Sequence, residues 1–180
     1  MLSARRLIPH AFLLLFIAAT ACAQGPPSKE DLLNAVFDHV ADSSESLEPK
    51  YYLAAEAAPC SFVKFDYDEW FKYALIETVP IGILNELAER SFHDRKRTAW
   101  QQGKLVKAIC VGKEKEDSLL HALSGIYYFS RPVFTDDNVY ALFDMTYRCD
   151  TRECGFSYTC LFRKTAEGWR LAGKMLRWRS

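Results

Sequence analysis

The six cysteines are the side chains of this sequence with the widest range of chemistry. They are Cys22, Cys60, Cys110, Cys149, Cys154 and Cys160. Cys149 and Cys154 lie closest together, with four residues between them, and the sequence contains no C-x-x-C pair. A close pair of cysteines can form a disulfide, a redox centre or part of a metal site. Because strand-like residues flank this pair on both sides, the sequence favours a structural disulfide that fixes the end of a hairpin.

The sequence contains no recognised catalytic or metal-binding motif. Beyond its first 23 residues it has three histidines: His39, His93 and His121. None of them lies in a G-x-S-x-G or H-E-x-x-H motif. Neighbouring carboxylates have simpler roles, since Asp66 and Glu69 are predicted to cap a helix and Asp136 and Asp137 to form a turn. We therefore predict no catalytic residue, no cofactor and no metal site.

One row of polar residues follows a predicted strand. Asp144, Thr146 and Arg148 occupy every second position, so their side chains share one face of that strand. They form the candidate binding face, although a solvated sheet surface with a cross-strand ion pair explains them as simply. Basic residues near the carboxyl end, interleaved with Trp169 and Trp178, fit ordinary outward-facing strand positions. The chain has 23 basic and 23 acidic side chains, and this balance argues against a nucleic-acid partner.

The amino terminus predicts export. Arg5 and Arg6 precede a short apolar run, and the small residues Ala21 and Ala23 predict cleavage before Gln24. Cleavage there leaves 21 basic and 23 acidic side chains in a secreted or periplasmic protein. The alternative is lipidation at Cys22, which would make the chain an outer-membrane lipoprotein. Contact with a membrane is expected only in that second case.

Export favours disulfides as the role of the remaining cysteines. The sequence predicts a bridge between Cys149 and Cys154. Its preferred second bridge joins Cys60 to Cys110, which leaves Cys160 buried and reduced, but other pairings of these thiols stay open.

The pattern of apolar residues predicts an α+β fold, with amino-terminal helices packed on a carboxyl-terminal antiparallel β-meander. Residues 1–23 are the signal peptide, 24–28 a tether and 29–180 a single domain. Helices are expected at about 29–41, 66–78 and 80–91, and short strands at 51–53, 61–65 and 105–111. A loop is expected at 112–117. The meander extends from about residue 130 to 179, and a change of phase near Met175 predicts a bulge.

A family resemblance rests on the run SRPVF-TDDN-VYALFDMTYRC-DTRE-CG and the later AEGWRL. The matching positions are Ser130, Pro132, Phe134, Ala141, Leu142, Cys149, Cys154, Gly155, Gly168 and Trp169. These positions resemble an uncharacterised group of secreted bacterial proteins and lipoproteins that carry a cysteine-flanked hairpin in a carboxyl-terminal sheet. In this chain Asp150 replaces the first glycine of that hairpin. The resemblance covers about 50 of the 180 residues, and it implies export and a fold but no activity.

The sequence leaves two functions open and does not decide whether the protein is an enzyme. The first is an exported, non-enzymatic domain that has a binding or structural role and a protein or cell-envelope partner. The second is a hydrolase-like or small-ligand-binding enzyme that uses dispersed polar residues such as Asp144, Arg148 or His121.

Overall fold

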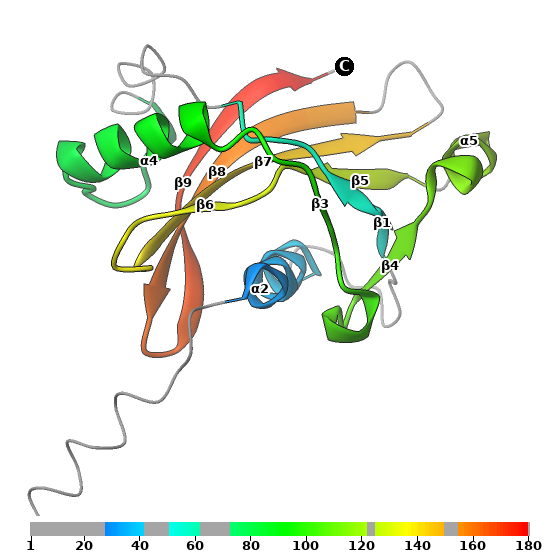
Figure 1. Ribbon diagram of the computed structural model, residues 1–180, viewed down its shortest axis with the longest axis horizontal. Coiled ribbons are helices and arrows are strands. Elements are labelled where there is room, and N and C mark those ends of the chain that lie inside the picture. Colours follow the sequence, from blue (N-terminus) through cyan, green and yellow to red (C-terminus); the bar gives the residue numbers. More distant parts are fainter. Residues whose placement is uncertain (1–27, 42–50, 62–72, 122–124, 150–154, 180) are drawn as a thin grey trace, which may run out of the picture.

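The computed structural model describes residues 28–41, 51–61, 73–121, 125–149 and 155–179. Within these residues the chain forms a large, mostly antiparallel sheet and three α-helices, so the predicted α+β class is confirmed. Two helices, α2 (Lys29–Ala41) and α4 (Ile81–His93), lie on different sides of the sheet, and α5 (Lys113–His121) lies at one end (Figure 1). None of these helices is long and apolar enough to span a membrane.

The three longest strands are consecutive and antiparallel, as predicted. They are β7 (Tyr140–Arg148), β8 (Gly155–Thr165) and β9 (Gly168–Arg179). The β8–β9 turn ends at Gly168, whose φ of 120° favours a residue without a Cβ atom. The register of β8 against β9 shifts opposite the stretch between Leu176 and Trp178, close to the predicted bulge.

The other strands are short and extend the sheet beyond the predicted meander. They are β1 (Tyr51–Ala54), β2 (Glu56–Ala57), β3 (Thr98–Ala99), β4 (Ala108–Val111), β5 (Ile126–Phe129) and β6 (Val133–Phe134). The main sheet has the order β4-β1-β5-β7-β8-β9, and β6 also pairs with β7. β1 is parallel to both β4 and β5, while β2 and β3 form a separate antiparallel pair. The carboxyl-terminal meander is therefore only part of the sheet.

Helix α2 has the predicted limits because its first turn is capped by a reciprocal pair. The Asp31 amide donates to Ser28 Oγ at 3.0 Å, and the Ser28 amide donates to Asp31 Oδ2 at 3.3 Å. The apolar face of α2 belongs to a buried cluster that includes Phe143 and Cys160 of the sheet. At its centre the Phe37 ring is fully buried and stacks on Tyr51 at 5.0 Å.

Helix α4 begins after Pro80, which fits the first turn because proline has no amide hydrogen to leave unpaired. Leu84 and Leu87 are fully buried in a second cluster with Leu142 and Leu161 of the sheet. Alternate residues of β7 thus pack into different clusters, the odd positions from Ala141 to Met145 with α2 and the even positions Tyr140 and Leu142 with α4. The polar row lies on the same face as Leu142, further along β7.

Three other sequence predictions differ from the structure. The segment predicted as a loop at 112–117 lies largely within helix α5, which begins at Lys113 and has Glu114 and Glu116 in its first turn. Acidic residues there are favourable because they face the positive end of the helix dipole. Most of the helix predicted at 66–78 lies outside the described residues, but its predicted end is wrong, since Leu75 forms a β-bridge with Gly173. The strand predicted at 105–111 is shorter and begins at Ala108, after a 3-10 turn.

Candidate functional site

The polar row predicted on β7 centres on a hydrogen-bonded carboxylate. Asp144 Oδ2 accepts hydrogen bonds from the amide and the hydroxyl of Ser61, both at 2.8 Å. Its other oxygen, Oδ1, accepts a bond of 2.7 Å from the hydroxyl of Thr159 on β8. These three bonds join a segment far away in the sequence to two neighbouring strands. Asp144 is therefore an anchor within the fold.

Asp144 is half-buried and its surroundings are polar. The Asp144 amide donates to Ser130 Oγ at 2.7 Å, and Ser130 donates its own amide to the Asp144 carbonyl oxygen at 2.9 Å. Thr159 is fully buried, and its hydroxyl also accepts a bond of 2.8 Å from Arg177 Nε. At this position the polar groups bond to one another, while Asp144 is half-buried and its partner Ser61 is exposed.

The other two residues of the row point to separate partners. The Thr146 and Ser157 hydroxyls lie 2.9 Å apart, and the Arg148 guanidinium lies 5.4 Å from the centre of the Tyr128 ring. Burial, followed by a hydrogen bond to Glu116, raises the pKa of Tyr128 to about 12. Neither Asp144 nor Arg148 forms the expected cross-strand ion pair with a described residue. Their role as a binding face stays a prediction.

The described residues do not form the predicted second disulfide, between Cys60 and Cys110. Cys110 carries a free thiol and packs against the cluster under α2, whereas Cys60 is buried in the cluster under α4. The Cys60–Cys110 pairing is therefore wrong in this structure, because the two residues contact different cores. Cys160 is a buried, free thiol as predicted, and its burial raises its pKa to about 12.

Several predicted positions lie outside the described residues. Cys154 and Cys22 are among them, so the hairpin disulfide with Cys149 and the lipidation site stay predictions. The side chains of His39 and His121 are also outside the described part of the chain. Among the side chains that are described, no three histidines, cysteines or carboxylates are grouped to hold a metal ion.

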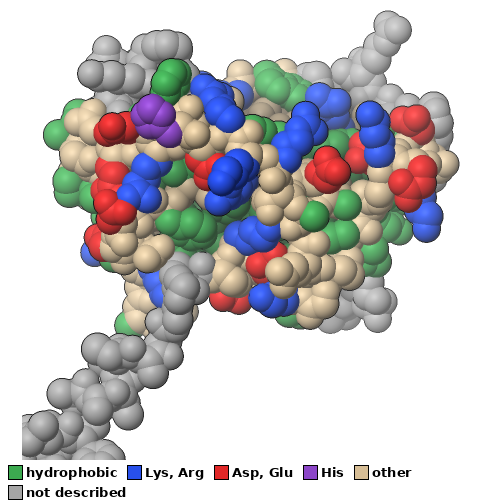
Figure 2. All heavy atoms as spheres, viewed as in Figure 1, with side chains coloured by type: hydrophobic (Ala, Val, Ile, Leu, Met, Phe, Trp, Pro, Cys, Tyr) green, Lys and Arg blue, Asp and Glu red, His purple; other side chains and the backbone are tan. Residues whose placement is uncertain are grey.

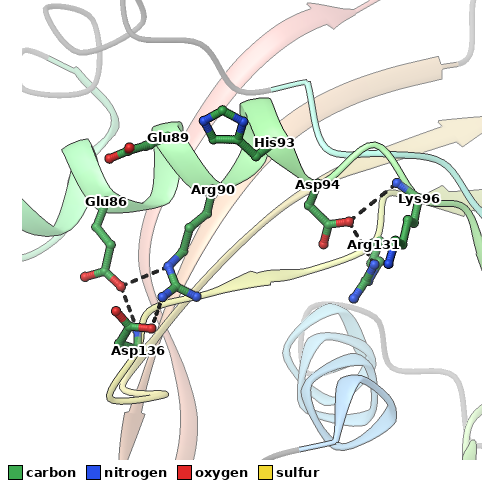
Figure 3. A pocket seen from close by; sticks show the side chains of 8 residues that line it. All are labelled: Glu86, Glu89, Arg90, His93, Asp94, Lys96, Arg131 and Asp136. Atoms are coloured by element: carbon green, nitrogen blue, oxygen red, sulfur yellow. Dashed lines mark hydrogen bonds and ion pairs between the residues drawn. The ribbon is translucent and has the colours of Figure 1, made fainter.

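The described surface contains a charged groove of about 590 Å³ between α4 and the β6–β7 turn. This volume is within the range of small-ligand sites. The eight residues that line it are Glu86, Glu89, Arg90, His93, Asp94, Lys96, Arg131 and Asp136, shown in Figure 3. They come from one helix, the connector that follows it, the β5–β6 junction and the β6–β7 turn. We call this feature the charged groove.

At the end near the β6–β7 turn, the groove is held by ion pairs between its two walls. Arg90 Nε on α4 lies 3.2 Å from Glu86 Oε1, and the guanidinium of Arg90 also pairs with Asp136 in the turn. The Asp136 amide donates to Glu86 at 2.6 Å. The adjacent Asp137 accepts bonds from the Thr135 hydroxyl and the Val139 amide, and these bonds hold the pKa of Asp137 below its usual value. The turn is thus fixed against the helix.

The other end of the groove is organised around Arg131. Its Nη1 lies 2.8 Å from Asp94 Oδ1, and its backbone amide donates to the Ala58 carbonyl at 2.6 Å. Lys96 is exposed, and its side chain makes no ion pair with a described residue. The same holds for Glu89 on α4. Figure 3 shows Asp94, Lys96 and Arg131 together at this end, away from Glu86 and Asp136.

No local pattern in the sequence predicts this groove. The sequence predicts a turn at Asp136 and no motif at His93, and nothing local relates either of them to Arg131. A partial signal exists, because Glu86, Glu89, Arg90 and His93 recur at spacings of three and four and so share neighbouring surface on α4. Comparisons with protein-family models, with curated proteins and with solved structures find no match to this chain.

Proposed function

We propose that this protein is an exported, non-enzymatic binding domain whose ligand occupies the charged groove. In this proposal the amino-terminal helices pack on the carboxyl-terminal sheet, and α4 forms one wall of the site. The observation that carries the proposal is a hollow of about 590 Å³ in which Arg90 and Arg131 are held by ion pairs. Groups fixed before binding lose less side-chain entropy when a ligand arrives.

The groove also offers charged groups that are available to a ligand. Glu89, His93 and Lys96 are exposed, and Glu89 and Lys96 make no ion pair with a described residue. The groove therefore combines a fixed frame with free donors and acceptors. Binding by charge and hydrogen bonding is the chemistry that such a surface supports.

The alternative is a hydrolase-like or small-ligand-binding enzyme that uses the sheet face at Asp144, Thr146 and Arg148. A general base must reach a proton of the substrate. Both oxygens of Asp144 already accept hydrogen bonds from the protein, and its partner Thr159 is fully buried. This arrangement supports the binding function more than the enzymatic one.

Export and the hairpin disulfide are part of the proposal and have direct tests. Mass spectrometry of the exported protein is expected to find a new amino terminus at Gln24, whereas an acylated Cys22 would establish the lipoprotein alternative. Peptide mapping without reductant is expected to recover a Cys149–Cys154 link. Free thiols at both positions would contradict the disulfide.

Binding can be tested with saturation-transfer NMR on a library of charged peptides, sugars and small acids. We expect binders that are lost in the triple variant Glu89→Ala/His93→Ala/Lys96→Ala, in which all three substituted side chains are exposed. The matched control is Glu114→Ala/Lys115→Ala, which removes exposed charges from α5 at the other end of the molecule (Figure 1). Binders that are equally well retained by the triple variant would contradict the groove as the site. Chemical conversion of a library member by the wild-type protein, abolished by Asp144→Asn, would favour the enzyme.

A further inference from the structure

The two ends of the charged groove carry opposite net charge. The end near the β6–β7 turn has three carboxylates and one guanidinium: Glu86 and Asp136 pair with Arg90, and Glu89 lines the groove without an ion pair to a described residue. At the other end the single carboxylate of Asp94 lies beside Lys96 and Arg131. The first end is therefore negative and the second positive.

The surface around the groove extends this separation. The connector beyond Asp94 continues with Arg95 and Arg97, both exposed. Arg97 is only loosely paired with Glu56 on β2, at 3.8 Å. In the space-filling view, acidic side chains gather over α4 at the left, and a band of lysine and arginine side chains lies over the centre of the face (Figure 2). A ligand of uniform charge would thus meet repulsion at one end of the groove.

We infer that the ligand of the charged groove is a short, extended peptide segment with a cationic group near one end and a carboxylate near the other. This inference rests on the proposed function and specifies its ligand class. In the bound state the cationic group contacts Glu89 and Glu86, and the carboxylate contacts Lys96 and Arg131. The charge pattern of the two ends fixes the direction of the segment along α4.

The length of the helix sets the spacing of the two charges. Arg131, a cation of the positive end, lies 2.8 Å from Asp94 at the end of α4. Glu86 and Asp94 are eight residues apart, which corresponds to about 12 Å along a helix that rises about 1.5 Å per residue. In an extended peptide, residues four positions apart are separated by about 13 Å and point to the same side. A lysine followed four positions later by a glutamate therefore matches both the length of the groove and its two charges.

The test uses blocked peptides of one length, acetyl-Lys-Ala-Ala-Ala-Glu-amide and its Lys/Lys and Glu/Glu counterparts, titrated by calorimetry at low ionic strength. We expect the Lys/Glu peptide to bind most tightly. Each of the single variants Glu89→Lys and Lys96→Glu is expected to weaken its binding by about two- to fivefold, the usual range for one exposed ion pair. Glu89→Lys is also expected to bind the Glu/Glu peptide more tightly than the wild type does. Lys96→Glu is expected to bind the Lys/Lys peptide more tightly than the wild type does. Glu114→Lys on α5 is the matched control and is expected to change none of these affinities.

The outcomes separate this inference from the proposed function. If a Lys/Lys or Glu/Glu peptide binds as tightly as the Lys/Glu peptide and the groove variants abolish that binding, the groove is a binding site but the dipolar ligand is wrong. If no peptide binds while a sugar or a small acid is lost in the triple groove variant, the inference fails and the proposed function stands. If the Lys/Glu peptide binds equally to all groove variants, both are overturned.

Discussion

Replacement of the Asp144 carboxylate is expected to destabilise the fold strongly, because it accepts three hydrogen bonds from two separate segments. A hydrogen bond to a charged group contributes about 1.5–3 kcal/mol, and the bond from Thr159 counts fully because that residue is buried. The two bonds from Ser61 count less, since Ser61 is exposed and water replaces part of what is lost. We expect Asp144→Ala to lower the free energy of unfolding by about 3 kcal/mol.

Two further variants, Asp144→Asn and Thr146→Val, test whether the loss comes from the hydrogen bonds to the Asp144 carboxylate. Asp144→Asn keeps one acceptor oxygen, but its amide group faces donors of Ser61 or Thr159 in place of the other oxygen. We therefore expect it to lose about half of the free energy that Asp144→Ala loses. Thr146→Val, on the same face, removes only the neutral bond to Ser157 and is expected to lose about 1 kcal/mol. Urea unfolding monitored by circular dichroism measures the order of the three variants, with an unchanged slope against denaturant as evidence for two-state behaviour.

The sign of the effect also distinguishes an anchor from an active-site group. Functional polar groups are commonly held at a cost to stability, so their removal is often neutral or stabilising. If Asp144→Ala unfolds within about 0.5 kcal/mol of the wild type, or is more stable, the interpretation of Asp144 as an anchor is refuted. The sheet face would then again be the better candidate for a functional site.

Three further predictions test the rest of the fold. Phe37→Ala is expected to cost about 3–5 kcal/mol in unfolding experiments, because the ring is fully buried between α2 and the sheet, and a loss under 1 kcal/mol would show that α2 does not pack there. Iodoacetamide at pH 8 is expected to label Cys110 before it labels the buried Cys160. Labelling of Cys110 is itself slowed, because burial and the nearby Glu30 raise the pKa of this thiol. Equal labelling rates in the folded protein would contradict the buried position of Cys160. Because the pKa of Asp137 is held below its unfolded value, its contribution to stability is present above about pH 4 and is lost as the pH falls through the folded pKa. The free energy of unfolding is therefore expected to be higher for the wild type than for Asp137→Asn at pH 6, and this difference is expected to shrink below pH 4. A difference that does not change with pH would contradict the stabilising role of the Asp137 carboxylate.

Local patterns in the sequence predict the elements whose residues interact mainly with their chain neighbours. The Ser28–Asp31 capping pair and the apolar residues that follow it define α2 to the residue. The alternation along β7 correctly separates Phe143 and Met145 from Asp144. Both patterns are decided within a few residues, so they can be predicted without knowledge of distant contacts.

Elements that depend on distant contacts could not be predicted in this way. β5 is apolar at consecutive positions because both of its faces are buried: Ile126 and Phe129 point to opposite faces, and both are buried. It therefore shows no alternation. The sequence of α5 is highly charged and therefore predicts a loop. Its contact with the sheet includes a hydrogen bond of 3.0 Å from the Tyr128 hydroxyl to Glu116.

The charged groove is the clearest case of a feature that cannot be predicted from the sequence. Arg131 lies between two strands, Asp136 lies in a turn, and the acidic residues of α4 lie more than 40 positions earlier. Only the pairing of β6 with β7 brings that turn against α4, where Arg90 pairs with Asp136. The sequence indicates that these residues are charged, but their grouping follows from the topology.

The most direct test of the groove as a binding site is amide chemical-shift mapping of the protein with the Lys/Glu peptide. We predict shifts concentrated in residues 86–96 and 131–136 that saturate with peptide concentration and weaken in the triple groove variant. Shifts concentrated instead at residues 144–148, or spread over the surface without saturation, would contradict the charged groove as the binding site.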